Sequence, residues 1–95
     1  MGATAVEWAW DQRTGSLAGK AVLITLAAEW DLKGACRLSA LKIAQRVDTD
    51  PSTAQRILDR LRERGLISWT AGAGRAPNTY VLSMVESPRS NRSHR

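Results

Sequence analysis

The sequence is nearly devoid of cysteine and histidine. Of 95 residues, Cys36 is the one cysteine and His94 is the one histidine. A single cysteine cannot form an internal disulfide, and this pair supplies too few ligands for a Cys/His zinc site. Paired carboxylates and Ser/His/Asp arrangements are also missing, and His94 lies in a polar tail without a rigid scaffold. We therefore expect no metal, no cofactor and no enzymatic activity.

Long apolar runs are missing as well. No stretch approaches the ~20 consecutive apolar residues that a membrane-spanning helix requires. The N-terminus lacks the basic segment and apolar block of a secretory signal. The sparse cysteine content suits a reducing compartment. These features predict a cytoplasmic protein without a membrane partner.

Positive charge is abundant but unevenly distributed. The formal net charge is +5, with 3 − 4 = −1 over residues 1–36 and 11 − 5 = +6 over residues 37–95. A concentration of basic side chains suits a polyanionic partner such as nucleic acid. Charge that serves only solubility would produce the same composition, so charge alone leaves both interpretations open.

The stretch 48–67 predicts a helix with a clear beginning and end. Asp50 can cap its N-terminus, Pro51 fits its first turn and Gly65 fits its C-terminal stop. One apolar stripe follows the helical period: Ala54, Ile57, Leu58 and Leu61. The opposite face carries Ser52, Arg56, Asp59 and Glu63, flanked by Gln55 and Arg60.

This stretch resembles the recognition helix of a winged helix-turn-helix DNA-binding domain. The residues that carry the resemblance are Thr53-Ala54-Gln55-Arg56, Leu58, Leu61 and Arg64-Gly65-Leu66-Ile67. Upstream, Ile43–Val47 resembles a positioning helix, and residues 19–27 resemble the opening helix of winged domains in bacterial and phage replication and regulatory proteins. The resemblance covers residues 17–83. It implies an α+β fold of three helices with a C-terminal β-hairpin wing.

The turn before the recognition helix departs from the family pattern of glycine, an apolar residue and then Ser or Thr. Asp48 stands at the glycine position, and Asp tolerates a left-handed backbone better than most residues. Thr49 is a smaller, half-polar replacement for the apolar residue. The carboxylates of Asp48 and Asp50 would repel phosphate, unless that of Asp50 is occupied in capping the helix.

The expected elements divide the chain into three parts. Residues 1–16 form an N-terminal extended segment that contains tryptophan, 17–84 form the winged domain and 85–95 form a disordered basic tail. Within the domain, we expect helices at Leu17–Trp30, Ala40–Val47 and 51–64. We expect strands at Cys36–Leu38, Leu66–Thr70 and Asn78–Ser83, with the wing at 71–78.

The N-terminal segment is distinguished by two tryptophans. Val6, Trp8 and Trp10 alternate with polar or small residues, which favours an extended backbone with one buried face. These tryptophans could cover the open side of the helical core, or they could form a subunit interface, where aromatic residues are enriched. If the chain forms a homodimer, this segment or the first helix would provide the interface.

The resemblance implies that the first turns of the recognition helix contact base edges in the major groove, while the wing approaches the minor groove or the backbone. The expected DNA-binding residues are Ser52, Thr53, Gln55, Arg56, Arg60, Arg75 and Asn78. Gln can pair with adenine, and Arg with guanine or phosphate. Each of these side chains could also be a solvated surface residue.

These features predict sequence-specific binding of double-stranded DNA by a transcription regulator. One alternative is a DNA-binding protein of phage or plasmid replication or partition. Another is a winged-helix protein-interaction module that does not bind DNA. Such a module has no need for Arg56, Arg60 and Arg75 on one side. We expect no small-molecule effector, because a chain of this length has little room for a dedicated pocket.

Overall fold

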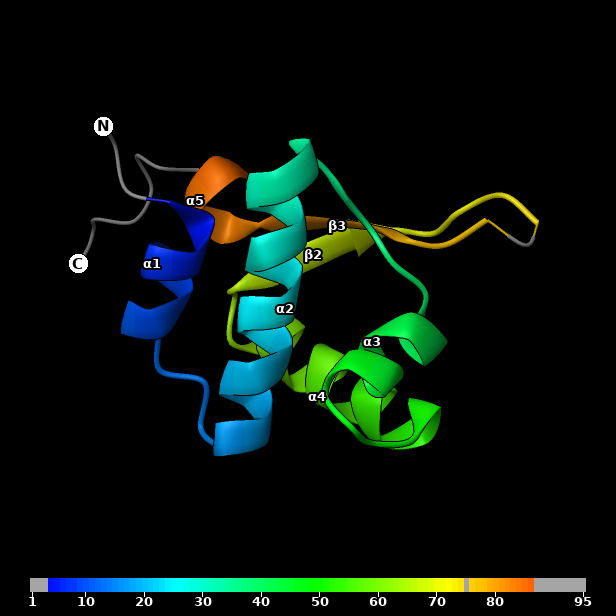
Figure 1. Cartoon of the computed structure of the whole chain (residues 1–95), viewed down its shortest axis with the longest axis horizontal. Helices are drawn as coiled ribbons and strands as arrows, with labels where there is room; N and C mark the ends of the chain where they lie inside the picture. The colour runs from blue at the N-terminus through cyan, green and yellow to red at the C-terminus, as the bar shows by residue number, and fades with distance from the viewer. Residues whose placement is uncertain (1–3, 75, 87–95) are drawn as a thin grey trace.

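The computed structural model describes residues 4–74 and 76–86, with side chains through Met84. Its elements are α1 (Ala5–Asp11), α2 (Leu17–Lys33), β1 (Cys36–Arg37), α3 (Ala40–Arg46), α4 (Pro51–Glu63), β2 (Ile67–Thr70), β3 (Thr79–Leu82) and α5 (Ser83–Glu86). The expected α+β fold is confirmed, with α2, α3 and α4 as the three helices and β2–β3 as the hairpin (Figure 1). The expected tail at 85–95 lies outside the described residues from position 87 onward.

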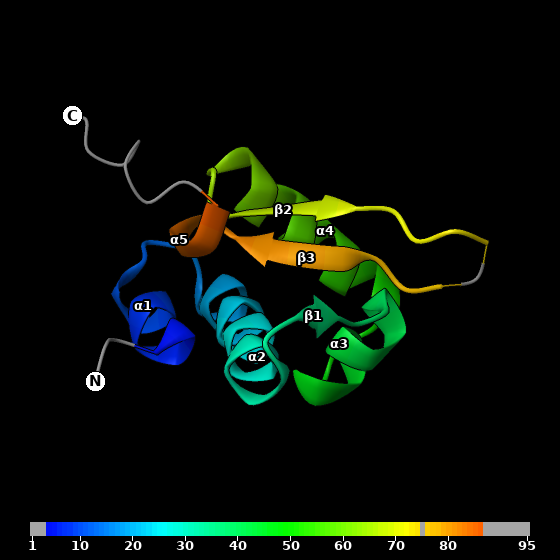
Figure 2. The same ribbon diagram turned by 90° about the horizontal axis from the view of Figure 1, so that it is seen from above.

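The three strands form one small antiparallel sheet in the order β1–β3–β2 (Figure 2). Cys36 pairs with Tyr80, and Ile67 pairs with Leu82. The connection between β2 and β3 projects away from the helices, as a wing would (Figures 1 and 2). The sheet thus anchors the hairpin on the short strand that leads from α2 to α3.

The core lies where α2 meets α3, α4 and the sheet. Its fully buried side chains include Val22, Leu23, Leu26, Ile43, Leu58, Leu61, Tyr80 and Leu82. The aromatic ring of Trp69 packs edge-on against Tyr80 at a centroid distance of 5.5 Å, a favourable aromatic geometry. Helix α4 is therefore held by its apolar stripe on one side, and its opposite side faces solvent.

The apolar residues of α3 do not all face the core. Leu41 is 55% exposed, whereas Ile43 and Ala44 are fully buried. Only 7 residues long, α3 turns a narrow face to the core, and that face is centred on Ile43 and Ala44.

The expectation of an extended segment before residue 17 is also wrong, because residues 5–11 form the helix α1. Thr4 caps it in a capping box: the Glu7 N–H donates to the Thr4 hydroxyl, and the Thr4 N–H donates to the Glu7 carboxylate, each at 3.0 Å. The first turn thus satisfies its own backbone donors, so helix is favoured locally despite the alternating apolar pattern.

Two charged side chains of α2 bind the opposite ends of α1. At the N-terminal end, the N–H groups of Ala5 and Val6 donate to the carboxylate of Asp31 at 2.8 and 3.0 Å. At the C-terminal end, the ammonium of Lys20 donates to the carbonyls of Ala9 and Trp10 at 3.2 and 2.6 Å, and to that of Gln12. Each charge matches the sign that the helix dipole favours at that end. Asp31 and Lys20 therefore align α1 along α2 (Figure 1).

The two tryptophans of α1 have different environments. Trp8 is partly buried and packs against the core, as the covering interpretation predicts. Trp10 is 62% exposed. Only the first of these side chains therefore serves mainly to cover the helical core.

A buried carboxylate joins α2 to α3. Glu29 is 4% exposed, and its oxygens lie 3.0 Å from Lys33 Nζ and 3.1 Å from Arg46 Nη1. Hydrogen bonds from Lys33 and then Arg46 hold the pKa of Glu29 below its ordinary value of 4.5, against the opposing effect of burial. The Arg46 contact fixes the C-terminal end of α3, from which the turn into α4 departs.

The contacts between Lys20 and the end of α1 predict the effect of the substitution Lys20→Met. Methionine keeps the aliphatic part of the side chain but removes the ammonium group. Carbonyls at the end of α1 lose a charged donor, and we expect the free energy of unfolding to fall by about 1–3 kcal/mol. Urea denaturation monitored by circular dichroism measures this loss. The control is Lys42→Met at an exposed position of α3, and equal losses in the two variants would contradict a specific role for Lys20.

The Glu29 cluster predicts a pH dependence of stability. Since the folded-state pKa is lowered, the contribution of Glu29 is complete above its ordinary value of 4.5 and is lost as the pH falls through the folded-state pKa. At neutral pH, we expect Glu29→Gln to reduce the unfolding free energy by about 1–2 kcal/mol, because both basic partners are partly exposed to screening solvent. Denaturation at a series of pH values should show this difference shrinking below pH 4.5. A difference that is constant across that range would contradict the ion-pair explanation.

Candidate nucleic-acid interface

The turn between α3 and α4 determines the direction of the candidate recognition helix. Asp48 adopts a left-handed backbone with a φ of 63°, as its place at the family's glycine position predicts. The Thr49 N–H donates to the Ala44 carbonyl at 2.8 Å, which closes the end of α3. Thr49 is half-buried at the position of the usual apolar residue. The turn therefore forms without glycine.

Asp50 begins α4 as predicted. One carboxylate oxygen accepts the Thr53 N–H at 2.9 Å, and the other accepts the Thr53 hydroxyl at 2.7 Å. The hydroxyl bond first, and the backbone bond second, lower the pKa of Asp50. The carboxylate is thus turned onto its own helix, with both oxygens engaged.

Arg56 completes a short chain of hydrogen bonds with this cap. Its Nη2 donates to the Thr53 hydroxyl at 3.3 Å, and that hydroxyl donates to Asp50. The arrangement places a positive guanidinium one helical turn from the negative cap. The N-terminal end of α4 is therefore less repulsive to phosphate than two aspartates at the turn would suggest.

The other expected residues of α4 differ in accessibility. Ser52 and Arg60 are exposed, as is Arg56, whereas Thr53 and Gln55 are partly buried. The Gln55 amide donates to Asp59 Oδ1 at 3.2 Å. Gln55 would have to break this bond to pair with a base edge, whereas Ser52 and Arg60 point into solvent without rearrangement.

Two arginines at the end of α4 make contacts that sequence reasoning did not anticipate. The Arg62 guanidinium lies 3.9 Å from the ring centroid of Trp69, a cation–π contact that ties α4 to β2. On another side, Arg64 Nη1 donates to the Arg13 carbonyl at 3.3 Å. Arg13 is 51 positions from Arg64, and Trp69 belongs to the strand that follows α4, so neither contact could be identified from the helical pattern of α4.

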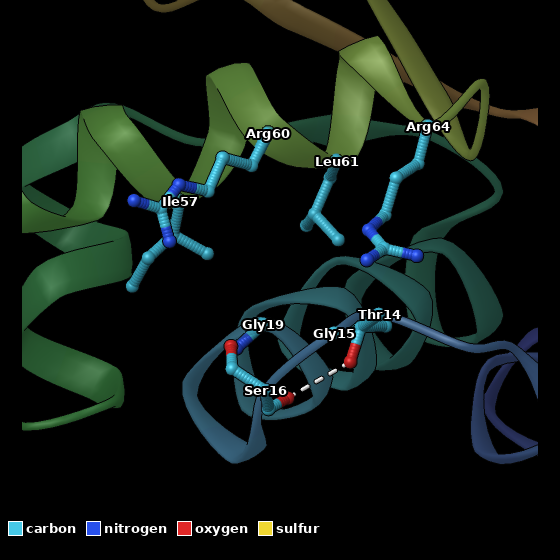
Figure 3. A pocket seen from close by; sticks show the side chains of 8 residues that line it. All are labelled: Thr14, Gly15, Ser16, Gly19, Ile57, Arg60, Leu61 and Arg64. Carbon is cyan, nitrogen blue, oxygen red and sulfur yellow. Dashed lines mark hydrogen bonds between the residues drawn. The ribbon is translucent and has the colours of Figure 1, made fainter.

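A hollow opens between the beginning of α2 and the side of α4 (Figure 3). Arg60 and Arg64 line its α4 side, and Gly15 and Ser16 line its α2 side. Arg64 reaches toward the turn before α2, and the Thr14 hydroxyl donates to the Ser16 carbonyl at 2.9 Å (Figure 3). An adjoining hollow adds Arg56 and Ala18. This side of α4 is consequently both concave and basic.

The wing contains two of the expected residues. Asn78 is partly buried, and its amide donates to the Tyr80 hydroxyl at 3.4 Å, so it supports the base of β3. Arg75 lies outside the described residues. At Gly72, a Cβ would collide with the Ala76 carbonyl oxygen, so the two arms of the loop approach closely there.

The described residues were also compared with the requirements of a metal site, a nucleophilic cysteine and a membrane-spanning helix. Among residues 4–74 and 76–86, His, Cys, Asp and Glu side chains form no group of three that could hold a metal. Burial raises the pKa of the Cys36 thiol to about 12, which suits a packed apolar residue rather than a nucleophile. The same residues include no helix of the length and apolarity needed to traverse a bilayer.

Comparison with known proteins supports the interpretation of the α3–α4 unit. Residues 32–68 match the family described as winged helix-turn-helix DNA-binding. This segment contains the end of α2, all of β1, α3 and α4, and the beginning of β2. Curated proteins provide no match, and neither do solved structures. The matched residues cover less than half of the chain, and they lie within the three-helix and hairpin fold described above. This part of the chain is therefore similar to winged helix-turn-helix DNA-binding domains.

Proposed function

We propose that the protein binds double-stranded DNA sequence-specifically and acts as a transcription regulator. In this proposal, the N-terminal half of α4 enters the major groove, and the wing at 71–78 lies on the minor groove or the backbone. The observation that carries the proposal is the exposed, positively charged side of α4, where Arg56 and Arg60 extend from the helix that leads out of the α3–α4 turn.

The distribution of charge along α4 supports contact through its first turns. Arg56 and Ser52 lie near the N-terminus, where side chains of a recognition helix reach base edges. Asp59 and Glu63 lie farther along and would approach phosphate if the whole helix entered the groove. A tilted helix keeps these carboxylates outside the groove, while Arg56 remains within reach of guanine or phosphate.

The wing is assigned a secondary role. Arg75 would contact the minor groove or its phosphates, and Asn78 would contribute mainly by positioning β3 through its bond to Tyr80. A narrow minor groove attracts arginine through its enhanced negative potential. The wing therefore adds affinity, whereas α4 supplies most of the base discrimination.

A role in phage or plasmid replication or partition would use the same contacts, because fold and DNA binding do not determine the process. Sequencing of the genomic sites that the protein occupies would separate these roles. Symmetric pairs of half-sites would also indicate the homodimer expected through α1 or α2. The proposal includes a cytoplasmic location and no small-molecule effector.

A protein-interaction module is the second candidate, and a specific observation favours it. Trp10 is 62% exposed and Leu17 is 86% exposed, on either side of the connection between α1 and α2. Large apolar side chains at a surface suit a protein contact. The two candidates differ in their response to salt, because phosphate contacts weaken as ions compete and apolar contacts do not.

Binding of duplex DNA should weaken steeply with salt. The logarithm of the association constant should fall linearly with the logarithm of salt concentration, by about 0.9 for each phosphate neutralised. Fluorescence anisotropy with a labelled duplex measures this slope. If no binding occurs even at low salt, the DNA-binding proposal is wrong and the interaction module replaces it.

Arg56→Ala tests the position of the recognition helix. We expect a loss of about 1–3 kcal/mol in binding free energy and a relaxed base preference, since Arg56 is placed to contact a base edge. Selection of bound sequences from a random duplex pool measures the preference. Arg62→Ala is the control, because it removes the same charge from the side of α4 that faces Trp69. Equal effects of the two variants would contradict the docking.

The substitution Asp50→Asn distinguishes the role of Asp50 in capping α4 from the repulsion between its carboxylate and DNA phosphate. Asparagine also caps helices, so the beginning of α4 should be retained while the negative charge is removed. We expect tighter DNA binding with a nearly unchanged thermal midpoint, both measurable on the purified variant. Asp50→Ala is the companion variant, which loses the cap as well and should lower the midpoint. Unchanged affinity in Asp50→Asn would show that this charge does not face phosphate.

A further inference from the structure

Three arginines of α4 form a continuous row beside the beginning of α2. Arg56, Arg60 and Arg64 are four residues apart, which corresponds to a rise of ~6 Å per step along one side of a helix. Arg56 and Arg60 line one hollow, and Arg60 and Arg64 line the adjoining one. Both hollows share Ser16. We call Arg56, Arg60 and Arg64 the basic edge.

No ion pair involves the basic edge within the described part of the chain. The two ion pairs found there both involve Glu29, near the C-terminal end of α2. Arg56 donates to a hydroxyl and Arg64 donates to a carbonyl, so neither contact supplies negative charge. Like charges four residues apart on a helix repel each other. An anionic partner along this edge would relieve that repulsion.

The α2 side of the hollow adds to the positive potential. Ser16 caps α2 by accepting the Gly19 N–H at 2.9 Å. The N–H groups of Leu17 and Ala18 have no intrahelical acceptor, since they belong to the first turn, and the positive end of the helix dipole lies there. The N-terminus of α2 therefore adds to the positive potential that the guanidinium groups of Arg56, Arg60 and Arg64 create by themselves.

The turn before α2 lets Arg64 approach closely. Gly15 has a φ of +84°, and a Cβ at this position would lie 2.5 Å from Arg64 Nη2. Glycine therefore meets two demands here, the left-handed backbone and the space for the guanidinium. As a result, Arg64 lies over the turn and extends the basic edge beyond the last residue of α4, rather than standing apart from the interface.

We propose that Arg60 and Arg64 of the basic edge bind backbone phosphates of one DNA strand, with a phosphate seated between Arg60 and the beginning of α2. This inference rests on the proposed function and specifies which side of α4 faces the strand. Contacts to phosphate fix the register of a protein on the duplex, while base contacts specify sequence. Arg60 and Arg64 thus position α4, and the residues of its first turns read the groove.

The experiment compares salt dependence in matched variants on a short duplex of mixed sequence. Arg60→Gln and Arg64→Gln should each reduce the slope of log K against log salt by about 0.9, the value for one phosphate contact. The double variant should reduce it by about twice that amount, with a several-fold weakening at moderate salt. Arg62→Gln is the control on the same helix, and its slope should equal that of the wild type.

Two further measurements test whether the effect of Arg60 arises from its charge and from contact with a particular phosphate. Arg60→Lys keeps the charge and should restore most of the slope, which a purely structural role for Arg60 would not produce. Neutral methylphosphonate linkages, introduced one at a time into the duplex, should include a position at which Arg60→Gln causes no further loss. Thermal melting followed by circular dichroism verifies that each variant is folded.

The outcomes separate the two proposals. If the wild type binds the duplex but Arg60→Gln and Arg62→Gln change the slope equally, the basic edge is refuted while DNA binding stands. If the wild type does not bind the duplex at low salt, the proposed function fails, and the basic edge fails with it. A slope reduced by Arg60→Gln and Arg64→Gln, but not by Arg62→Gln, establishes the phosphate-binding side of α4.

Discussion

The bidentate cap that Asp50 places on α4 is the interaction on which the candidate interface depends. It defines the beginning of α4, and it engages both oxygens of a carboxylate that would otherwise repel phosphate. The left-handed backbone of Asp48 brings the chain to that cap within a turn of three residues. Arg56 then joins the cap through Thr53, so positive charge accompanies the negative cap at the end of the helix that the proposed docking places in the groove.

Most of α4 and its turn could be predicted from sequence because their determinants are local. The cap at Asp50, the stop at Gly65 and the intervening apolar spacing each act within a few residues. The exposed face was predictable for the same reason. What the pattern could not provide is the engagement of Gln55 with Asp59, because a side-chain hydrogen bond on a polar face leaves no trace in hydrophobic periodicity.

The error at α1 has the opposite origin. Its alternating apolar residues favour a strand, but its two ends are satisfied by Asp31 and Lys20, which belong to another helix. The local capping box and these tertiary contacts together therefore favour a helix in a segment too short to be helical by propensity alone. In this arrangement Trp10 remains outside the core, at 62% exposure.

The basic edge illustrates a further limit of reading one helix at a time. A projection of α4 places Asp59 and Glu63 to one side of Arg56, and Arg60 and Arg64 to the other. Packing against the beginning of α2 forms hollows on the arginine side, which Arg56, Arg60 and Arg64 border and which α4 alone does not possess. The exposed face of α4 carries charges of both signs, but its side next to α2 carries the positive charges of the basic edge. Since phosphate attraction depends on the local sum of charges, the contact with α2 determines which side of α4 is suited to the DNA strand.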